Sequence, residues 1–303
     1  MQSSTPAPRG PSHRTGEVLA ALPLCAAFLA WAPLAIADPA PPARALPRWN
    51  ADPPPQQDEG RTSHPTSVRH GEQRPFVFLQ DPSIPLPAEV SVEYTLQGAS
   101  GVAAMRPLAA NLGVQGAVHG ATVSIGATPW LAVFASGFVR QPMDQANASV
   151  SGTGQAGVRL LFTAPTAPFR LGVSSAVLRE FEGSVGVATR VTGTYDIGAL
   201  RLAGNAHVER VFATGRDSLD LLAFGGASFR ATDQLRLGAE YVGQDLEDAF
   251  ERREAEGGAR HFAGPVAALQ FFGDSLWVTA GPAFGLNEKS PRLLGRLSMV
   301  ASF

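Results

Sequence analysis

Cysteine is almost absent from this chain, which has 303 residues and a single cysteine, Cys25. This scarcity excludes a disulfide scaffold, a zinc ribbon and an iron–sulfur protein. An excess of charge of one sign is also lacking, because 24 basic residues face 26 acidic ones, and this argues against nucleic acid as a partner. Mean hydropathy is only +0.03 although 45% of the residues are hydrophobic, so the apolar excess of a helical membrane bundle is missing too.

Proline is abundant but unevenly spread, and its distribution divides the chain into three parts. Five prolines lie in residues 1–37, twelve in residues 38–87 and eight in residues 88–303. The sequence therefore predicts a leader over 1–37, a Pro-rich disordered tether over 38–87 and a Gly-rich folded body over 88–303.

The leader combines a basic start, an apolar stretch over 18–34 and the small-residue site Ala35-Ile36-Ala37. These three features together predict a secretory signal peptide that is removed after Ala37. A retained membrane anchor is the alternative, and Pro23 and Pro33 within the apolar stretch weigh against it. Lipidation at Cys25 is a second alternative, disfavoured by the bulky Leu24 before the cysteine.

The tether is expected to be extended, because it cannot bury enough apolar surface to offset its chain entropy. Its one apolar patch is Phe76-Val77-Phe78-Leu79. This patch could pack as a plug or contact a partner, but the more common arrangement is a lead-in to the first strand, and that is the expectation here.

From residue 88 onward the pattern changes to an alternation of period two, which is typical of half-buried strands. Val90, Val92, Tyr94 and Leu96 alternate with polar residues, and the pattern returns over 200–208, 219–229, 235–241 and 293–303. Connections that separate these strands are short at 128–129, 164–168, 196–198, 231–233 and 273–274, and longer at 98–110, 141–154, 179–183, 213–217, 245–260 and 287–290. Because short and long connections alternate along the chain, the sequence predicts an antiparallel up-and-down transmembrane β-barrel of about 12 strands.

Two other folds are alternatives to the barrel. A soluble β-sandwich also shows alternation, so period alone does not exclude it. A helical membrane protein is suggested by the run 107–139, which contains no Asp, Glu, Lys or Arg. Pro129 within that run favours two strands that turn there, with Trp130 at a membrane interface. Aromatics near the other short turns predict one aromatic girdle, formed by Trp130, Phe169, Tyr195, Phe229, Phe272 and Phe303.

The last strand carries a resemblance to a known class. Residues 295–303 alternate apolar side chains and finish on an aromatic carboxy-terminal residue, with Leu297, Met299, Ala301 and Phe303 on the apolar face. This segment resembles the terminal strand of bacterial outer-membrane β-barrel proteins, in which it is the assembly signal. The resemblance implies an outer-membrane location, a periplasmic tether, and the barrel-assembly machinery and outer-membrane lipid with lipopolysaccharide as partners.

If the apolar faces meet lipid, the opposite faces line the lumen. Parity then assigns to the lumen Glu89, Glu93, Arg159, Arg170, Arg190, Arg201, His207, Glu209, Asp220, Arg230, Arg236, Glu240, Arg292 and Arg296. Mixed charge has two interpretations: an anion-leaning, narrow or gated pore for small solutes, or an interior cross-braced by ion pairs. A structural or adhesive barrel that acts through its external loops is the alternative function.

Enzyme function is not expected, and no cofactor is predicted. A barrel-type lipid hydrolase would resemble a His-x-Ser pair on one strand, whereas this chain has His119-Gly120-Ala121 and His207-Val208-Glu209. His207 and Glu209 share a face and could exchange a proton, but no serine stands near them as a nucleophile. A lipid hydrolase is therefore kept only as a minor alternative.

The loop from Asp245 to Arg260 is rich in charge of both signs. Leu246 and Phe250 are four residues apart, which suggests a short amphipathic helix. The loop could hold divalent cations between lipopolysaccharide phosphates, or fold inward as a constriction. A solvated loop is the simpler interpretation.

Overall fold

The computed structural model of the protein describes residues 74–100, 112, 116–141, 151–213, 219–249, 258–273 and 275–303. The predicted leader and residues 38–73 of the predicted tether lie outside the described residues. Among the described residues, no helix has the length and apolar content needed to cross a bilayer.

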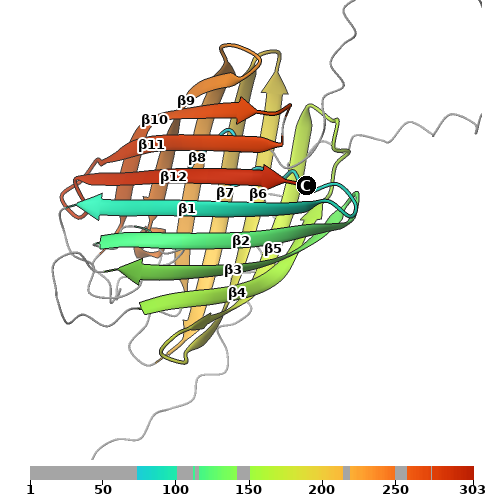
Figure 1. Ribbon diagram of the computed structural model, residues 1–303. Coiled ribbons are helices and arrows are strands. Elements are labelled where there is room, and N and C mark those ends of the chain that lie inside the picture. The colour runs from blue at the N-terminus through green and yellow to red at the C-terminus, as the bar shows by residue number, and fades with distance from the viewer. Residues whose placement is uncertain are drawn as a thin grey trace, which may run out of the picture. The chain divides into compact units, whose positions relative to one another are not determined.

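Twelve strands form within the described residues, and they close into one antiparallel barrel (Figure 1). They are β1 (Val90–Ser100), β2 (Gly116–Thr128), β3 (Leu131–Gln141), β4 (Ser151–Leu161), β5 (Phe169–Glu180), β6 (Val185–Ile197), β7 (Leu200–Phe212), β8 (Asp220–Arg230), β9 (Leu235–Gln244), β10 (Arg260–Phe271), β11 (Leu276–Gly285) and β12 (Leu293–Ser302). The predicted fold class and strand number are confirmed.

Each strand pairs with its neighbours in sequence, and β1 pairs with β12 to close the ring. In the closing pair Tyr94 lies opposite Met299 and Leu96 opposite Leu297. The proposed assembly residues Leu297, Met299, Ala301 and Phe303 therefore belong to, or directly follow, the strand that completes the barrel. Closure leaves no unpaired sheet edge, which matters for a sheet placed in lipid because the lipid offers no hydrogen bonds.

The connections divide the barrel into two ends. At the turn end, which also holds the first residue of β1 and the last of β12, the links comprise residues 129–130, 162–168, 198–199, 231–234 and 272–275. The β2–β3 and β6–β7 links have only two residues each, and in the β6–β7 turn Gly198 adopts a φ of +60° that L side chains rarely take. At the loop end the links comprise residues 101–115, 142–150, 181–184, 213–219, 245–259 and 286–292.

Burial alternates along the strands, and the exposed face is the apolar one. Outward side chains such as Val123, Val177 and Leu237 are 42%, 57% and 47% exposed. A continuous apolar outer surface of this kind is unstable in water and is stable against lipid acyl chains.

Exposed aromatic residues collect at both ends of the barrel. The six predicted girdle residues all lie at the turn end and are exposed, from Phe169 at 39% to Phe272 at 83%. A second belt, which the sequence analysis did not predict, lies at the loop end and contains Phe181, Phe212 and Phe284. Two belts that flank an apolar band correspond to the two interfaces of a bilayer.

Candidate functional site in the barrel lumen

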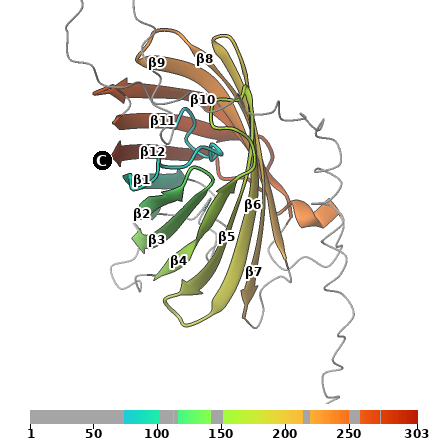
Figure 2. The same cartoon turned by 90° about the vertical axis from the view of Figure 1, so that its right-hand side faces the viewer.

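Residues 74–87, which we call the plug segment, lie inside the barrel as far as Pro85 (Figure 2), and Leu86 and Pro87 are exposed at the turn end. Phe76, Val77, Phe78 and Leu79 are only 2–4% exposed. They pack against inward apolar side chains of the wall, namely Leu222 and Phe224 of β8, Val242 of β9, Phe262 and Val266 of β10, Ala283 of β11 and Leu294 of β12, and also against Leu112 of the first external loop.

The structure thus differs from the expectation of an extended lead-in over the last part of the tether. The reason is complementarity: β8 to β12 present apolar side chains on their inner face, and an unfilled lumen would expose them to water. The plug segment supplies matching apolar surface, and Leu112 covers it from the loop end.

A single carboxylate holds the apex of the plug segment. Glu240 of β9, 5% exposed, accepts hydrogen bonds from three consecutive backbone N–H groups, those of Val77, Phe78 and Leu79, at 2.9, 3.0 and 3.0 Å. Backbone donors buried in the lumen need acceptors, and an ionised acceptor makes stronger hydrogen bonds than a neutral one. Glu240 therefore fixes both the depth and the orientation of the apex.

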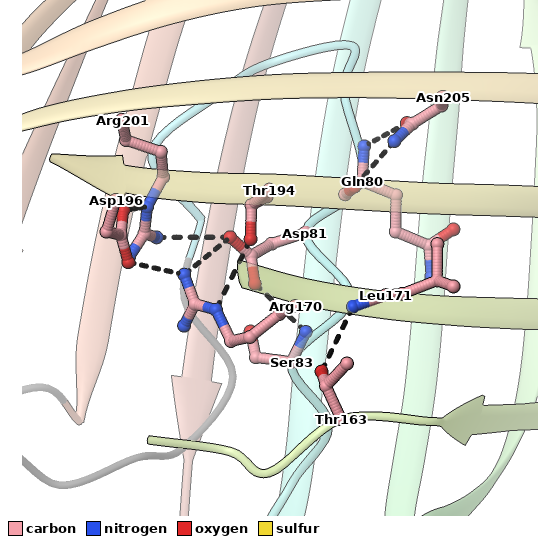
Figure 3. A network of polar contacts seen from close by, with 10 residues as sticks. All are labelled: Gln80, Asp81, Ser83, Thr163, Arg170, Leu171, Thr194, Asp196, Arg201 and Asn205. Atoms are coloured by element: carbon pink, nitrogen blue, oxygen red, sulfur yellow. Dashed lines mark hydrogen bonds and ion pairs between the residues drawn. The ribbon is translucent and has the colours of Figure 1, made fainter. Parts of the chain in front are cut away.

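A second anchor lies nearer the turn end, around Asp81 (Figure 3). Its Oδ2 is 3.1 Å from Nη1 of Arg201 and 3.9 Å from Nη2 of Arg170. Both arginines also contact Asp196, at 2.6 and 2.8 Å. Burial by itself raises the pKa of Asp81, but the positive charges of Arg201 and Arg170, with hydrogen bonds from Ser83, outweigh burial and hold that pKa below its ordinary value.

Further polar contacts secure the two sides of the apex. Asn205 of β7 pairs with the backbone of Gln80 in both directions, accepting from its N–H at 2.7 Å and donating to its carbonyl at 2.9 Å. On the other side Arg74 is 3.0 Å from Glu93 of β1, and Thr279 of β11 donates to the Arg74 carbonyl at 2.6 Å. The plug segment is therefore bonded to wall strands on opposite sides of the barrel.

The plug segment leaves a cavity of about 120 Å³ against the remaining part of the wall. Its far side is lined by Thr122 of β2, Ser136 of β3, Gln155 of β4 and Ser174 of β5. The cavity is polar and has room for several water molecules. The lumen therefore has two unlike halves: an apolar half under β8 to β12 that the plug segment fills, and a polar half under β2 to β6 that stays open.

Arginines are prominent in the cavity lining, and three of them lie on aromatic rings. Arg159 is 5.0 Å from the ring centre of Phe134, Arg190 is 5.0 Å from that of Phe224, and Arg296 is 5.8 Å from that of Phe78 in the plug segment. At these distances the negative faces of the rings attract the guanidinium groups.

His207 links one of these arginines to a carboxylate. Arg190 Nε lies 3.3 Å from His207 Nδ1, and His207 Nε2 lies 3.3 Å from Glu209 Oε2. Because a guanidinium can only donate, Nδ1 must accept, and the ring proton sits on Nε2 facing Glu209. These contacts hold Arg190 in place and account for the shared face of His207 and Glu209.

The residues that strand alternation assigned to the lumen lie at different places in the structure. Lining the cavity are Glu93, Arg159, Arg190, His207, Glu209 and Arg296. Anchoring the plug segment are Arg170, Arg201 and Glu240. Asp220 is buried at the loop end, Arg236 is half-buried near the turn end, and Glu89 just before β1 accepts from the backbone of Leu86. Arg230 is exposed at the end of β8, and Arg292 is exposed just before β12.

Part of the loop from Asp245 to Arg260 is described. Residues Leu246–Ala249 form a short 3-10 helix, and Phe250 lies outside the described residues. Asp245 and Glu247 are buried with Asp220, and carboxylate oxygens of the three lie within 4.8 Å of one another. Arg260 Nη1 is 3.5 Å from Asp245. Asp245 and Glu247 are thus buried at the loop end of the barrel.

Several residues of the site were not identified from the sequence, including Asp81, Asn205 and the inward aromatics Phe134 and Phe224. One sequence signal was available for the lumen. In β8, the side chains at both the odd and the even positions of Leu221-Leu222-Ala223-Phe224 are apolar. A strand that reads apolar on both faces is covered on both faces, so a barrel strand with this pattern requires something apolar in the lumen.

Comparison with known proteins gives structural likeness at low sequence identity. No family model matches the chain, and neither does any curated protein. The KdgM porin in complex with disordered oligogalacturonate aligns with a TM-score of 0.49 and 7% identity, over 71% of this chain and 99% of that one. An outer membrane channel from Pseudomonas putida F1 gives 0.47 and 12%, over 73% and 97%. The translocator domain of the autotransporter NalP from Neisseria meningitidis gives 0.37 and 12%, over 71% and 88%.

The assignment of the fold follows from features of the chain itself. A closed antiparallel ring, an exposed apolar outer face and aromatic belts at both ends are the properties that define membrane-spanning barrels. By its fold, this chain is a β-barrel of the bacterial outer-membrane type.

Proposed function

We propose that the chain is exported by its leader to the outer membrane and there provides a narrow, gated path for small solutes. In this arrangement the short turns and the plug segment enter from the periplasm, and the long connections face outward. The observation that carries the proposal is the division of the lumen: the plug segment fills the apolar half and leaves a polar cavity beside it.

The plug segment acts as the gate. Apart from one isolated β-bridge between Pro87 and Gly126 of β2 at the turn end, it is bonded to the wall by side chains, chiefly Glu240 and the Asp81 network. Contacts of this type can break without opening the sheet, whereas removing a strand would disrupt two hydrogen-bonded ladders. Movement of this one segment would widen the path while the barrel stays closed.

Conductance of the refolded full-length chain in planar bilayers tests the proposal. We expect small, resolved current steps, and uptake of small sugars or amino acids in liposome swelling. The absence of both steps and uptake would exclude passage through this barrel. Amino-terminal sequencing of membrane-inserted protein from cells tests the export step, for which the expected first residue is Asp38.

A structural or adhesive barrel is the second candidate function, and one observation favours it. At the loop end, Leu112 packs with the plug apex and with inward residues of β8 to β12, such as Leu222 and Leu294. This packing closes that half of the lumen to water. If the polar half is also closed at both mouths, the outward loops become the active part of the molecule, and neither bilayer nor swelling measurements will detect passage.

A further inference from the structure

The polar cavity carries an imbalance of charge. Among the described residues that line it are four arginines, Arg74, Arg159, Arg190 and Arg296, and two glutamates, Glu93 and Glu209. Two lining carboxylates therefore face four arginines, and Glu240, whose charge also acts on Arg296, still leaves an excess of one positive charge, with His207 neutral in the tautomer set by Arg190. Such an imbalance in a confined space, partly shielded from water, favours an anion.

The arginines are also oriented. Arg190 lies over Phe224 and Arg296 over Phe78, while the Nε of Arg190 is bonded to His207. Both arginines line the cavity, and the N–H edge of a guanidinium matches the paired oxygens of a carboxylate or phosphate. Both side chains remain partly exposed on the cavity side.

The opposite side of the cavity offers neutral hydrogen-bonding groups. Thr122 donates to Ser136 at 2.9 Å, and Gln155 and Ser174 lie on the neighbouring strands. Hydroxyl and amide groups can bond the hydroxyl or remaining oxygen atoms of a solute without adding charge. One side therefore selects charge, and the other can satisfy the polar atoms of a small molecule.

We propose that this cavity is a binding site for small solutes that carry two or more carboxylate or phosphate groups, held by Arg190 and Arg296. The proposal deepens the proposed passage function and rests on it only for the route, because binding can be measured in protein that does not conduct. The site concentrates such anions midway along the path and excludes cations of similar size.

Calorimetry on the full-length protein in neutral detergent tests binding, with citrate and inorganic pyrophosphate as separate probes and choline as the cation control. We expect saturable binding of at least one anion, weakening as sodium chloride is raised because the attraction is electrostatic. No saturable binding of either anion, or choline binding of equal strength, would overturn the proposal.

Matched variants locate the site. Arg190→Gln and Arg296→Gln each remove one guanidinium from the cavity, and each is expected to weaken anion binding about tenfold or more. Arg230→Gln makes the same charge change at an exposed position outside the cavity, and we expect unchanged affinity. Equal weakening in all three variants would show that the anion responds to overall charge and would overturn the assignment.

Folding of each variant is checked by its heat-modifiable gel mobility, and Arg190→Lys provides a second control if Arg190→Gln misfolds. Lysine keeps the charge but not the planar edge, so we expect intermediate affinity. If Arg190→Lys binds the anion as weakly as Arg190→Gln does, the result would contradict a charge-based site. Saturable binding without current steps supports the site while refuting passage, and current steps without binding do the reverse.

Discussion

At the scale of single residues, the lumen is organised by buried charges that each serve a backbone or an opposite charge. Glu240 accepts hydrogen bonds from three amides of the plug segment, and Asp81 forms ion pairs with Arg201 and Arg170. Buried ions without such partners destabilise a fold by several kcal/mol, so each of these pairs is a point at which one substitution should release the segment.

Removal of the Glu240 carboxylate tests the first anchor. Glu240→Ala leaves three buried amides without acceptors, at a cost of about 1–3 kcal/mol each. We predict that chymotrypsin then cleaves after Phe76 or Phe78, detected by mass spectrometry, and that conductance rises. Glu182→Ala, an exposed loop change, should do neither. Full protease protection in folded Glu240→Ala protein would contradict the role of this anchor.

The low pKa of Asp81 gives the second anchor a pH dependence. Because the pKa is lower with the segment docked than in the released chain, the anchor is fully effective above the ordinary carboxyl pKa of about 3.9 and is lost as pH falls through the docked value. We predict constant conductance from pH 7 to 5 and a rise below about pH 4. Asp81→Asn should raise conductance already at pH 7; a pH profile identical to that of the wild type would refute this anchor.

At the scale of elements, alternation of period two located the strands and the turns but could not reveal what fills the barrel. Leu96 on β1 follows the simple rule of an apolar outer and a polar inner face. Leu222 of β8 and Leu294 of β12 break it, because their inner partners come from a segment far away in the chain. The sequence showed the apolar patch at 76–79 and the doubly apolar strand, but only the folded register brings them together.

Two neighbouring glycines of β8 provide a matched test of the packing. A Cβ at Gly226 would lie 2.6 Å from Leu79 Cδ1 and 3.0 Å from Phe76 Cε1, whereas a Cβ at Gly225 meets nothing within 4 Å. We predict that Gly226→Val displaces the plug segment and raises both conductance and chymotrypsin cleavage, while Gly225→Val, on the lipid side, leaves both unchanged. Equal behaviour of the two variants would contradict the packing described.

At the scale of the whole molecule, the barrel is predictable because lipid imposes one rule on every strand. That rule, an apolar outer face on every strand, accounts for the even strand number, the alternating connection lengths and the terminal Phe303. It also accounts for the aromatic belt at the turn end. The interior follows no such rule, since charges there can face water, a partner charge or a bound segment. Parity therefore names Arg190 and Arg201 alike, although one lines the cavity and the other holds Asp81.

The most direct test compares single-channel currents of the full-length chain with those of a variant that lacks residues 74–87, under a salt gradient across a planar bilayer. The account predicts small steps with anion-leaning reversal potential for the full-length chain, and steps several times larger for the variant. Equal conductance of the two proteins, or a cation-selective reversal potential in the full-length chain, would contradict a barrel gated by this segment.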